Sequence, residues 1–166
     1  MPNWCQNEVT VYADTKGILD QFRKFVKGDN EEFSFQSILP VPSELTGTCS
    51  PTRICTDDEY HEWIREHQPT YDFNDRPITK QMSERFKNKY GADNWYDWSV
   101  QNWGTKWEVD YVEYEQLDEQ SIRYNFDTAW SPPEGIYDTL VERFPDLEIS
   151  WFYREEGMQF AGYLPN

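Results

Sequence analysis

The stretch NWYDWSVQNWGTKW, residues 94–107, holds four of the eight tryptophans of this 166-residue chain. A fifth, Trp130, follows in the segment FDTAWSPP, residues 126–133. Tryptophan combines a large apolar surface with one N–H that requires a partner when it is buried. A cluster of this kind forms either the anchor of a small core or the lining of a binding site.

The tryptophan block has two interpretations. In the first, Trp103, Trp107 and Trp130 belong to the core, and Trp107 and Trp130 lie buried on the two strands of one hairpin. Replacing Trp103 or Trp130 by alanine should then cost roughly 3–5 kcal/mol. In the second interpretation, the aromatic side chains line a groove for a planar ligand. The candidate ligand groove consists of Trp95, Trp98, Asn102, Trp103, Lys106, Asp127 and Trp130.

The hydrophobic pattern around this block predicts an alternation of strands and helices. Outside residues 41–104, the predicted elements are strands at 7–13, 33–39, 107–115, 122–130, 147–153 and 158–164, with helices at 15–27 and 131–144. The last helix is expected to begin with a capping box formed by Ser131 and Glu134. Strands 107–115 and 122–130 are predicted to pair as a hairpin.

This order of elements predicts a ferredoxin-like α+β fold, a mainly antiparallel sheet with helices on one face. Residues 41–104 are predicted to form a mostly helical insertion between the two halves of the sheet, within a single domain spanning residues 1–166. In the insertion, Thr56 and Glu59 form a predicted capping box. A second helix is expected to open at Pro77 and to end at Gly91.

The chain is strongly acidic, with a net charge of −16 from 31 acids and 15 bases. Residues 1–104 hold 17 acids and 11 bases, whereas residues 105–166 hold 14 acids and only 4 bases. Contact with a nucleic-acid backbone requires clustered Lys and Arg, so we expect no direct nucleic-acid binding. A surplus of acids favours solubility, and it also attracts a partner with a basic surface.

Six acids lie on the predicted hairpin between Glu108 and Glu119. Like charges on a hairpin repel one another, so their concentration there does not serve stability. Side chains two apart on one face of a strand lie about 7 Å from each other. A row of carboxylates at this spacing could imitate the phosphates of DNA. A slip of the alternation at Tyr111 and Val112 divides the acids between two faces. The candidate partner-binding residues are Glu108, Asp110, Glu113, Glu115, Asp118 and Glu119.

Three cysteines, no membrane-spanning run and no secretory signal lead us to expect a cytoplasmic protein. The set Cys49, Cys55, His61 and His67 does not have the spacing of a zinc site, so no metal and no cofactor are expected. The sequence also lacks a nucleophile elbow and a phosphate-binding glycine-rich loop. We therefore assign no catalytic residue.

Three motifs carry a resemblance that spans nearly the whole chain. They are MPNWCQN at residues 1–7, NWGTKW at 102–107 and FDTAWSPP at 126–133. In this order they resemble the YubB-like, Api-like family of small proteins carried by phages, plasmids and other bacterial mobile elements. The resemblance implies a ferredoxin-like domain inside a bacterial host cell, and it supplies no catalytic residue. Glu108 stands where the family pattern is expected to have aspartate.

Three classes of function follow from these observations. The first is a non-enzymatic acidic binding protein that interferes with a basic host protein, such as a defence or DNA-binding factor, by imitating DNA. The second is a protein that binds or sequesters a small ligand or nucleotide in the aromatic groove. The third is an enzyme of a type that these motifs do not define. Steep weakening of partner binding by salt would distinguish the first class.

Overall fold

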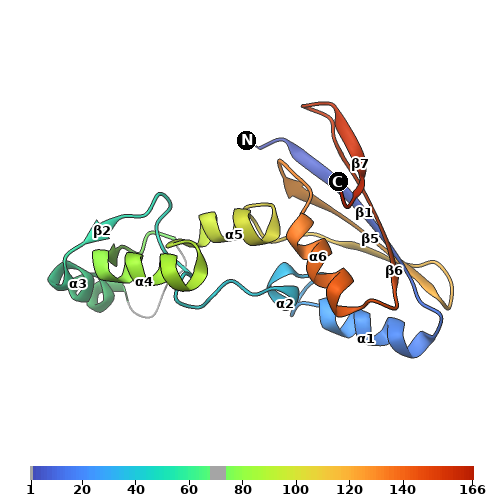
Figure 1. Ribbon diagram of the computed structural model, residues 1–166, viewed down its shortest axis with the longest axis horizontal. Coiled ribbons are helices and arrows are strands. Elements are labelled where there is room, and N and C mark those ends of the chain that lie inside the picture. Colours follow the sequence, from blue (N-terminus) through green and yellow to red (C-terminus); the bar gives the residue numbers. More distant parts are fainter. Residues whose placement is uncertain (1, 68–73) are drawn as a thin grey trace. The chain divides into compact units, whose positions relative to one another are not determined.

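The computed structural model describes residues 2–67 and 74–166 and divides the chain into two compact units. The first unit comprises Met1–Pro40 and Asn102–Asn166, and the second comprises Val41–Gln101. The course of the chain through both units can be followed in Figure 1. Residues 102–104, which were expected to belong to the insertion, are part of the first unit.

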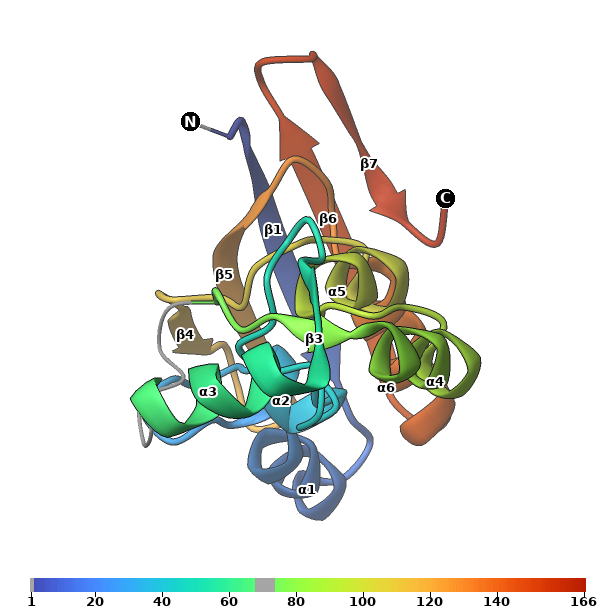
Figure 2. The ribbon, with the colours of Figure 1, turned by 90° about the vertical axis from the view of Figure 1, so that its left-hand side faces the viewer.

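The first unit contains a five-stranded antiparallel sheet in the order β4-β5-β1-β6-β7 (Figure 2). Three helices, α1, α2 and α6, lie along one face of this sheet (Figure 1). The α+β prediction of a mainly antiparallel sheet with helices on one face is confirmed. The elements are β1 (Trp4–Tyr12), α1 (Lys16–Val26), α2 (Phe35–Ile38), β4 (Glu113–Gln116), β5 (Ser121–Ala129), α6 (Glu134–Arg143), β6 (Glu148–Glu155) and β7 (Phe160–Leu164).

Strand β1 lies at the centre of the sheet, paired with β5 and β6, and every second side chain along it is buried. Cys5, Val9 and Val11 are fully buried, as the alternation predicts. Asn7 lies on the same buried face, where its side-chain amide donates to the Thr128 hydroxyl at 2.9 Å. Its side-chain oxygen accepts a hydrogen bond from the Trp151 indole at 3.0 Å. The polar residue is therefore tolerated in the core because its hydrogen bonds are satisfied.

The core between sheet and helices consists largely of aromatic rings. Rings from all three helices contact rings on the buried face of the sheet, which fixes the helices to that face. The centroid distances are 6.4 Å for Phe22–Tyr124, 5.9 Å for Phe35–Phe126 and 6.1 Å for Tyr137–Trp151.

The strand predicted at residues 33–39 is wrong, because Phe35–Ile38 form the short helix α2. The carboxylate of Glu108 accepts hydrogen bonds from the backbone N–H groups of Phe35 and Gln36, both at 2.7 Å. These are N–H groups of the first helical turn, which have no partner within the helix. Glu108 lies 73 residues further along the chain than Phe35, so a local pattern could not reveal this interaction.

The predicted hairpin exists as the antiparallel pair β4–β5, but it is shorter than expected. Trp107 and Trp130 lie outside these strands and are 40% and 43% exposed. Trp130 has a φ of 71°, which takes it out of the extended conformation. The chain before β4 leaves the sheet where Glu108 reaches towards α2. The core interpretation is therefore wrong for Trp107 and Trp130, whereas Trp103 is buried with 2% exposed.

Helix α6 begins without the predicted capping box. Its N-cap position is Pro133, which makes no side-chain capping hydrogen bond. The hydroxyl of Ser131 instead donates to the backbone oxygen of Gly104 at 2.6 Å. Ser131 therefore links two segments of the first unit rather than beginning the helix.

In its described residues, 41–67 and 74–101, the second unit is mostly helical and contains the short parallel strand pair β2–β3. The capping box is confirmed, because Thr56 and Glu59 exchange hydrogen bonds of 2.9 and 3.3 Å. Helix α4 is capped by Thr79 rather than opened at Pro77, and it ends at Gly91 as predicted. The elements are β2 (Ile54–Cys55), α3 (Asp57–His67), β3 (Ile78–Thr79), α4 (Lys80–Tyr90) and the larger part of α5 (Trp95–Trp103).

Candidate functional site

The two tryptophan motifs of the first unit, residues 102–107 and 126–133, are joined by polar contacts. The Thr105 hydroxyl donates to the backbone oxygen of Ala129 at 2.9 Å. Gly104 has a φ of 89°, and a Cβ there would lie 2.9 Å from the backbone nitrogen of Glu134. A glycine is required at this position for both reasons. Much of the motif pattern thus serves to connect the end of β5 to the segment that precedes β4.

The seven residues of the candidate ligand groove are divided between the two units. Trp95 and Trp98 lie on α5 within the second unit, whereas Asn102, Trp103, Lys106, Asp127 and Trp130 belong to the first unit. The Trp103 indole donates to the backbone oxygen of Leu39 at 2.8 Å and packs on Phe35. Trp103 is consequently a core residue. Asp127 lines a cavity on the first unit, which is described below.

The six residues of the candidate partner-binding hairpin have different environments. The Glu108 carboxylate accepts hydrogen bonds from the first turn of α2. Asp118 accepts a hydrogen bond from the Gln120 backbone N–H at 2.8 Å, and this bond lowers the pKa of its carboxyl. Glu115 lies opposite Arg123 in the sheet, and Glu119 is exposed in the turn. Asp110 and Glu113 line the same cavity as Asp127.

This cavity, called the acidic groove below, has a volume of about 430 Å³. A smaller cavity of about 190 Å³ adjoins it and shares Trp4, Asp110 and Asp127. Trp107 lines the smaller cavity. None of the described residues that line either cavity carries a positive charge. The acidic groove is lined by Trp4, Gln6, Asp110, Tyr111, Glu113, Asn125, Phe126 and Asp127.

The carboxylates of the acidic groove repel one another. Partial burial raises the pKa of the Asp127 carboxyl above its usual range, and the nearby carboxylates of Asp110 and Glu113 raise it further. A cation in the groove would relieve this repulsion. The site therefore has the electrostatic character of a receptor for an ammonium or guanidinium group.

Exposed aromatic side chains stand beside these carboxylates. Trp4 is 47% exposed and Tyr111 is 68% exposed, and the rings of Trp4 and Trp107 are 6.2 Å apart. The ammonium group of Lys106 lies 3.9 Å from the centroid of the Trp107 ring, a cation–π contact. The sequence interpretation missed Trp4 and Tyr111. Alternation along β1 indicates the exposure of Trp4, which lies opposite the buried face, but it gives no such signal for Tyr111, which it groups with the buried Val109.

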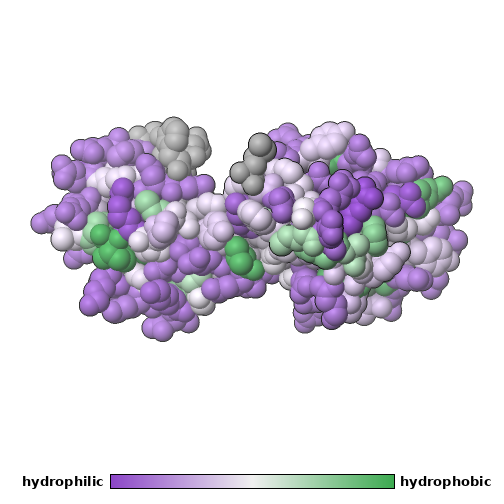
Figure 3. All heavy atoms as spheres, turned by 90° about the horizontal axis from the view of Figure 1, so that it is seen from above, coloured by the Kyte–Doolittle hydropathy of each residue, from purple (hydrophilic) through white to green (hydrophobic). Residues whose placement is uncertain are grey.

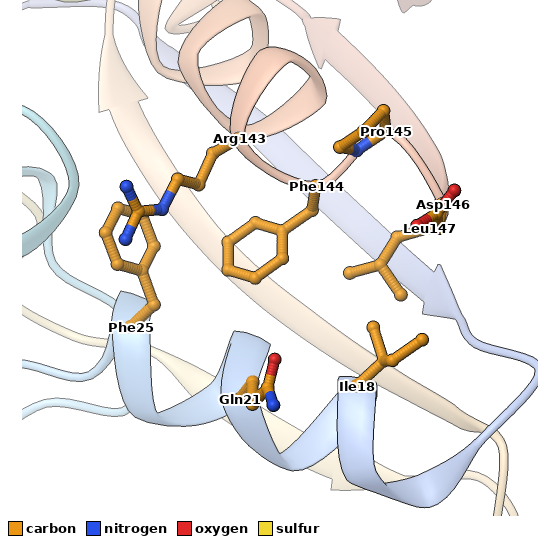
Figure 4. Close-up of a pocket in the computed structure, with 8 residues that line it drawn as sticks. All are labelled: Ile18, Gln21, Phe25, Arg143, Phe144, Pro145, Asp146 and Leu147. Carbon is orange, nitrogen blue, oxygen red and sulfur yellow. The ribbon is translucent and has the colours of Figure 1, made fainter.

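A second hollow of about 420 Å³ lies between α1 and the segment that follows α6 (Figure 4). Ile18, Phe25, Phe144 and Leu147 give it apolar walls, and the Arg143 guanidinium lies over the Phe25 ring, 5.0 Å from its centroid. Its polar side chains do not converge on a common point (Figure 4). We therefore regard the acidic groove as the candidate functional site.

Metal ligation is not indicated in the described part of the chain. Among residues 2–67 and 74–166, no three His, Cys, Asp or Glu side chains are grouped so that they could hold a metal ion. Burial raises the pKa of the Cys5 thiol to about 12, which makes it a poor nucleophile or ligand. None of the described helices is long and apolar enough to cross a membrane.

The fold of the first unit defines an α+β domain of the ferredoxin-like class. Residues 102–165 match the family model described as the ferredoxin-like domain in Api92-like protein. The structure is similar to the crystal structure of protein Api92 from Yersinia pseudotuberculosis, with a TM-score of 0.54 and 13% identity over 98% of this chain and 93% of that chain. At this identity the likeness concerns the fold. The match to the family model is a similarity of residues 102–165 to Api92-like proteins, and no curated protein matches the sequence.

Proposed function

We propose that this chain is a non-enzymatic binding protein that uses the acidic groove to engage a basic surface of another protein. The observation that carries the proposal is the grouping of Asp110, Glu113 and Asp127 around one cavity without a basic residue in its lining. The carboxylates of Asp110 and Glu113 raise the pKa of Asp127, so the ionised form of Asp127 destabilises the free protein. A basic partner offsets that cost, so the arrangement favours binding.

The surface properties of the chain agree with recognition by charge. The net charge of −16 gives a long-range attraction for basic surfaces. Hydrophilic side chains predominate on the face shown in Figure 3, and hydrophobic ones are confined to small separate areas. A broad apolar patch, which often marks a protein interface, is not seen on that face. Polar and ionic contacts are therefore the expected source of specificity.

Imitation of DNA is the more specific form of this proposal. Glu113 and Glu115 are exposed and lie two residues apart on β4, which places their side chains about 7 Å from each other. Asp110 and Asp127 extend the negative surface beyond the end of that strand. The partner would then be a DNA-binding or defence protein of a bacterial host. A phage or plasmid origin and a cytoplasmic location are parts of the same proposal, which rests on family analogy rather than on the fold.

A small organic cation is the second candidate ligand. The exposed rings of Trp4 and Tyr111 beside three carboxylates favour a cationic aromatic or quaternary amine. A phosphate-bearing nucleotide is disfavoured because every charged residue that lines the acidic groove is negative.

Affinity capture from bacterial lysate at low and high salt tests the protein-binding proposal. The variant Asp110→Asn, Glu113→Gln, Asp127→Asn removes the charges of the acidic groove. The control variant Asp29→Asn, Glu142→Gln, Glu148→Gln removes three exposed charges elsewhere in the first unit.

A basic protein captured by wild type and by the control variant, but lost from the groove variant and at high salt, is the expected result. DNA should compete with that protein for the groove if imitation of DNA is correct. Equal capture by the groove variant and wild type would show that the groove is not the binding surface. Co-purification of an amine in place of a protein would favour the second candidate.

A further inference from the structure

The backbone of β5 presents its hydrogen-bonding groups alternately to its two neighbours. On the β1 side, the Ala13 N–H donates to the backbone oxygen of Gln120, and the Trp130 N–H donates to the backbone oxygen of Asn3, both at 2.9 Å. Ser121 accepts from Leu117 on the β4 side at 3.0 Å. In an antiparallel sheet the direction alternates along the strand. Even-numbered residues of β5 therefore face β1, and odd-numbered residues face β4.

Strand β4 does not reach the end of β5. Its first residue, Glu113, is paired with Asn125, and the next odd-numbered residue of β5 is Asp127. The segment before Glu113 is not a strand, and no backbone or side-chain partner from the described residues bonds the Asp127 N–H or C=O. The following odd-numbered residue, Ala129, has its oxygen bonded to Thr105. One donor and one acceptor of the main chain at Asp127 thus face the acidic groove.

The acidic groove consequently combines an unpaired strand edge with three carboxylates. An extended peptide that adds to a strand edge gains main-chain hydrogen bonds, and its alternate side chains enter the adjacent pockets. The negative lining selects Arg or Lys at those side-chain positions. The exposed rings of Trp4 and Tyr111, which line the same groove, provide an aromatic surface for such a cation.

We infer that the partner engages this chain through an extended basic segment that pairs with β5 at Asp127, between β5 and the segment that carries Asp110 and Tyr111. This inference rests on the proposed function and defines its partner more closely. It requires backbone pairing as well as charge, whereas the proposed function requires charge alone.

Two synthetic peptides separate these requirements. The first is a blocked hexapeptide of alternating arginine and valine. The second has the same sequence with a methyl group on every peptide nitrogen, which preserves the charge and removes the donors needed for strand pairing. We expect the unmethylated peptide to bind the full chain at least about tenfold more tightly in calorimetric titration, because two main-chain hydrogen bonds are at stake.

Amide hydrogen exchange shows where the peptide binds. The unmethylated peptide should slow exchange at the Asp127 amide and leave the amides of the edge strand β7 unchanged. Equal affinity of the two peptides, absence of binding, or protection of β7 in place of Asp127 would each overturn the inference. If the two peptides bind wild type with equal affinity and neither binds the groove variant, the strand-pairing inference fails and the charge-based proposal stands. The inference and the proposed function can therefore fail separately.

Discussion

At the scale of single residues, polar side chains explain much of the motif pattern. Asn7, Thr128 and Trp151 form one buried hydrogen-bonded group that connects β1, β5 and β6. An unpaired polar group in this core would cost about 1–3 kcal/mol, so Asn7, which bonds both Thr128 and Trp151, is the residue on which the group depends. The asparagine of the N-terminal motif and the threonine of FDTAWSPP are therefore coupled, although they lie 121 residues apart.

The tryptophans of the central block should differ in their contribution to stability. Trp103→Ala is expected to lower the free energy of unfolding by roughly 3–5 kcal/mol, because it empties a core position. Trp107→Ala and Trp130→Ala should change it by less than about 1 kcal/mol, because these side chains are substantially exposed. Urea denaturation of the three variants measures the difference. Similar losses in all three would mean that Trp107 and Trp130 are buried in solution.

At the scale of elements, the position of α6 depends on a close backbone approach. A Cβ at Gly135 would lie 1.7 Å from the backbone oxygen of Asn102, so the first turn of α6 fits against the end of α5 only with glycine. Both residues belong to the first unit. The helix thus begins at a close approach of two backbone segments, and its N-cap residue makes no side-chain capping hydrogen bond.

Two glycine substitutions test this explanation. Gly135→Ala should destabilise the protein by about 3 kcal/mol or more, because backbone must move to admit the methyl group. Gly17→Ala on α1 is the matched control, since a Cβ there meets nothing within 4 Å. It should stabilise the protein by up to about 1 kcal/mol through helix propensity. Thermal denaturation followed by circular dichroism compares them, and a neutral Gly135→Ala would contradict the close approach.

At the scale of the whole molecule, two aspartates should give opposite pH dependences. Asp127 has a raised pKa, so its ionised form is disfavoured in the native state. This penalty is absent below the ordinary pKa of 3.8 and is complete above the raised native pKa. For Asp93, burial acts to raise the pKa, but hydrogen bonds from Ser83 and Thr52 outweigh it, and the pKa is lowered. Its stabilisation is present above 3.8 and is lost as the pH falls through the lowered native pKa.

Urea denaturation of the full chain between pH 3 and pH 8 tests these signs. Asp127→Asn should stabilise the protein at pH 7, and the gain should disappear on acidification. Asp93→Asn should destabilise it at pH 7, and the loss should diminish on acidification. A stability of Asp127→Asn equal to that of wild type at every pH would show that the carboxylates of the acidic groove do not repel one another.

The sequence by itself determined the elements whose patterns are local. Strand β1, helix α1, the Thr56–Glu59 capping box and the β4–β5 hairpin follow from periodicity and capping within a few residues. The ferredoxin-like class followed from their order, and the net charge indicated the negative character of the site.

Only the tertiary structure decided which acids act together and which tryptophans are buried. The Glu108 carboxylate accepts a hydrogen bond from the N–H of Phe35 in α2, 73 residues away in the sequence. The chain before β4 therefore lies against α2 at this point and not in the sheet. Trp107 becomes exposed, and the Asp127 edge of β5 is left open beside Asp110 and Glu113. Contacts of this range depend on how the chain folds back on itself, and local hydrophobic periodicity carries no information about them.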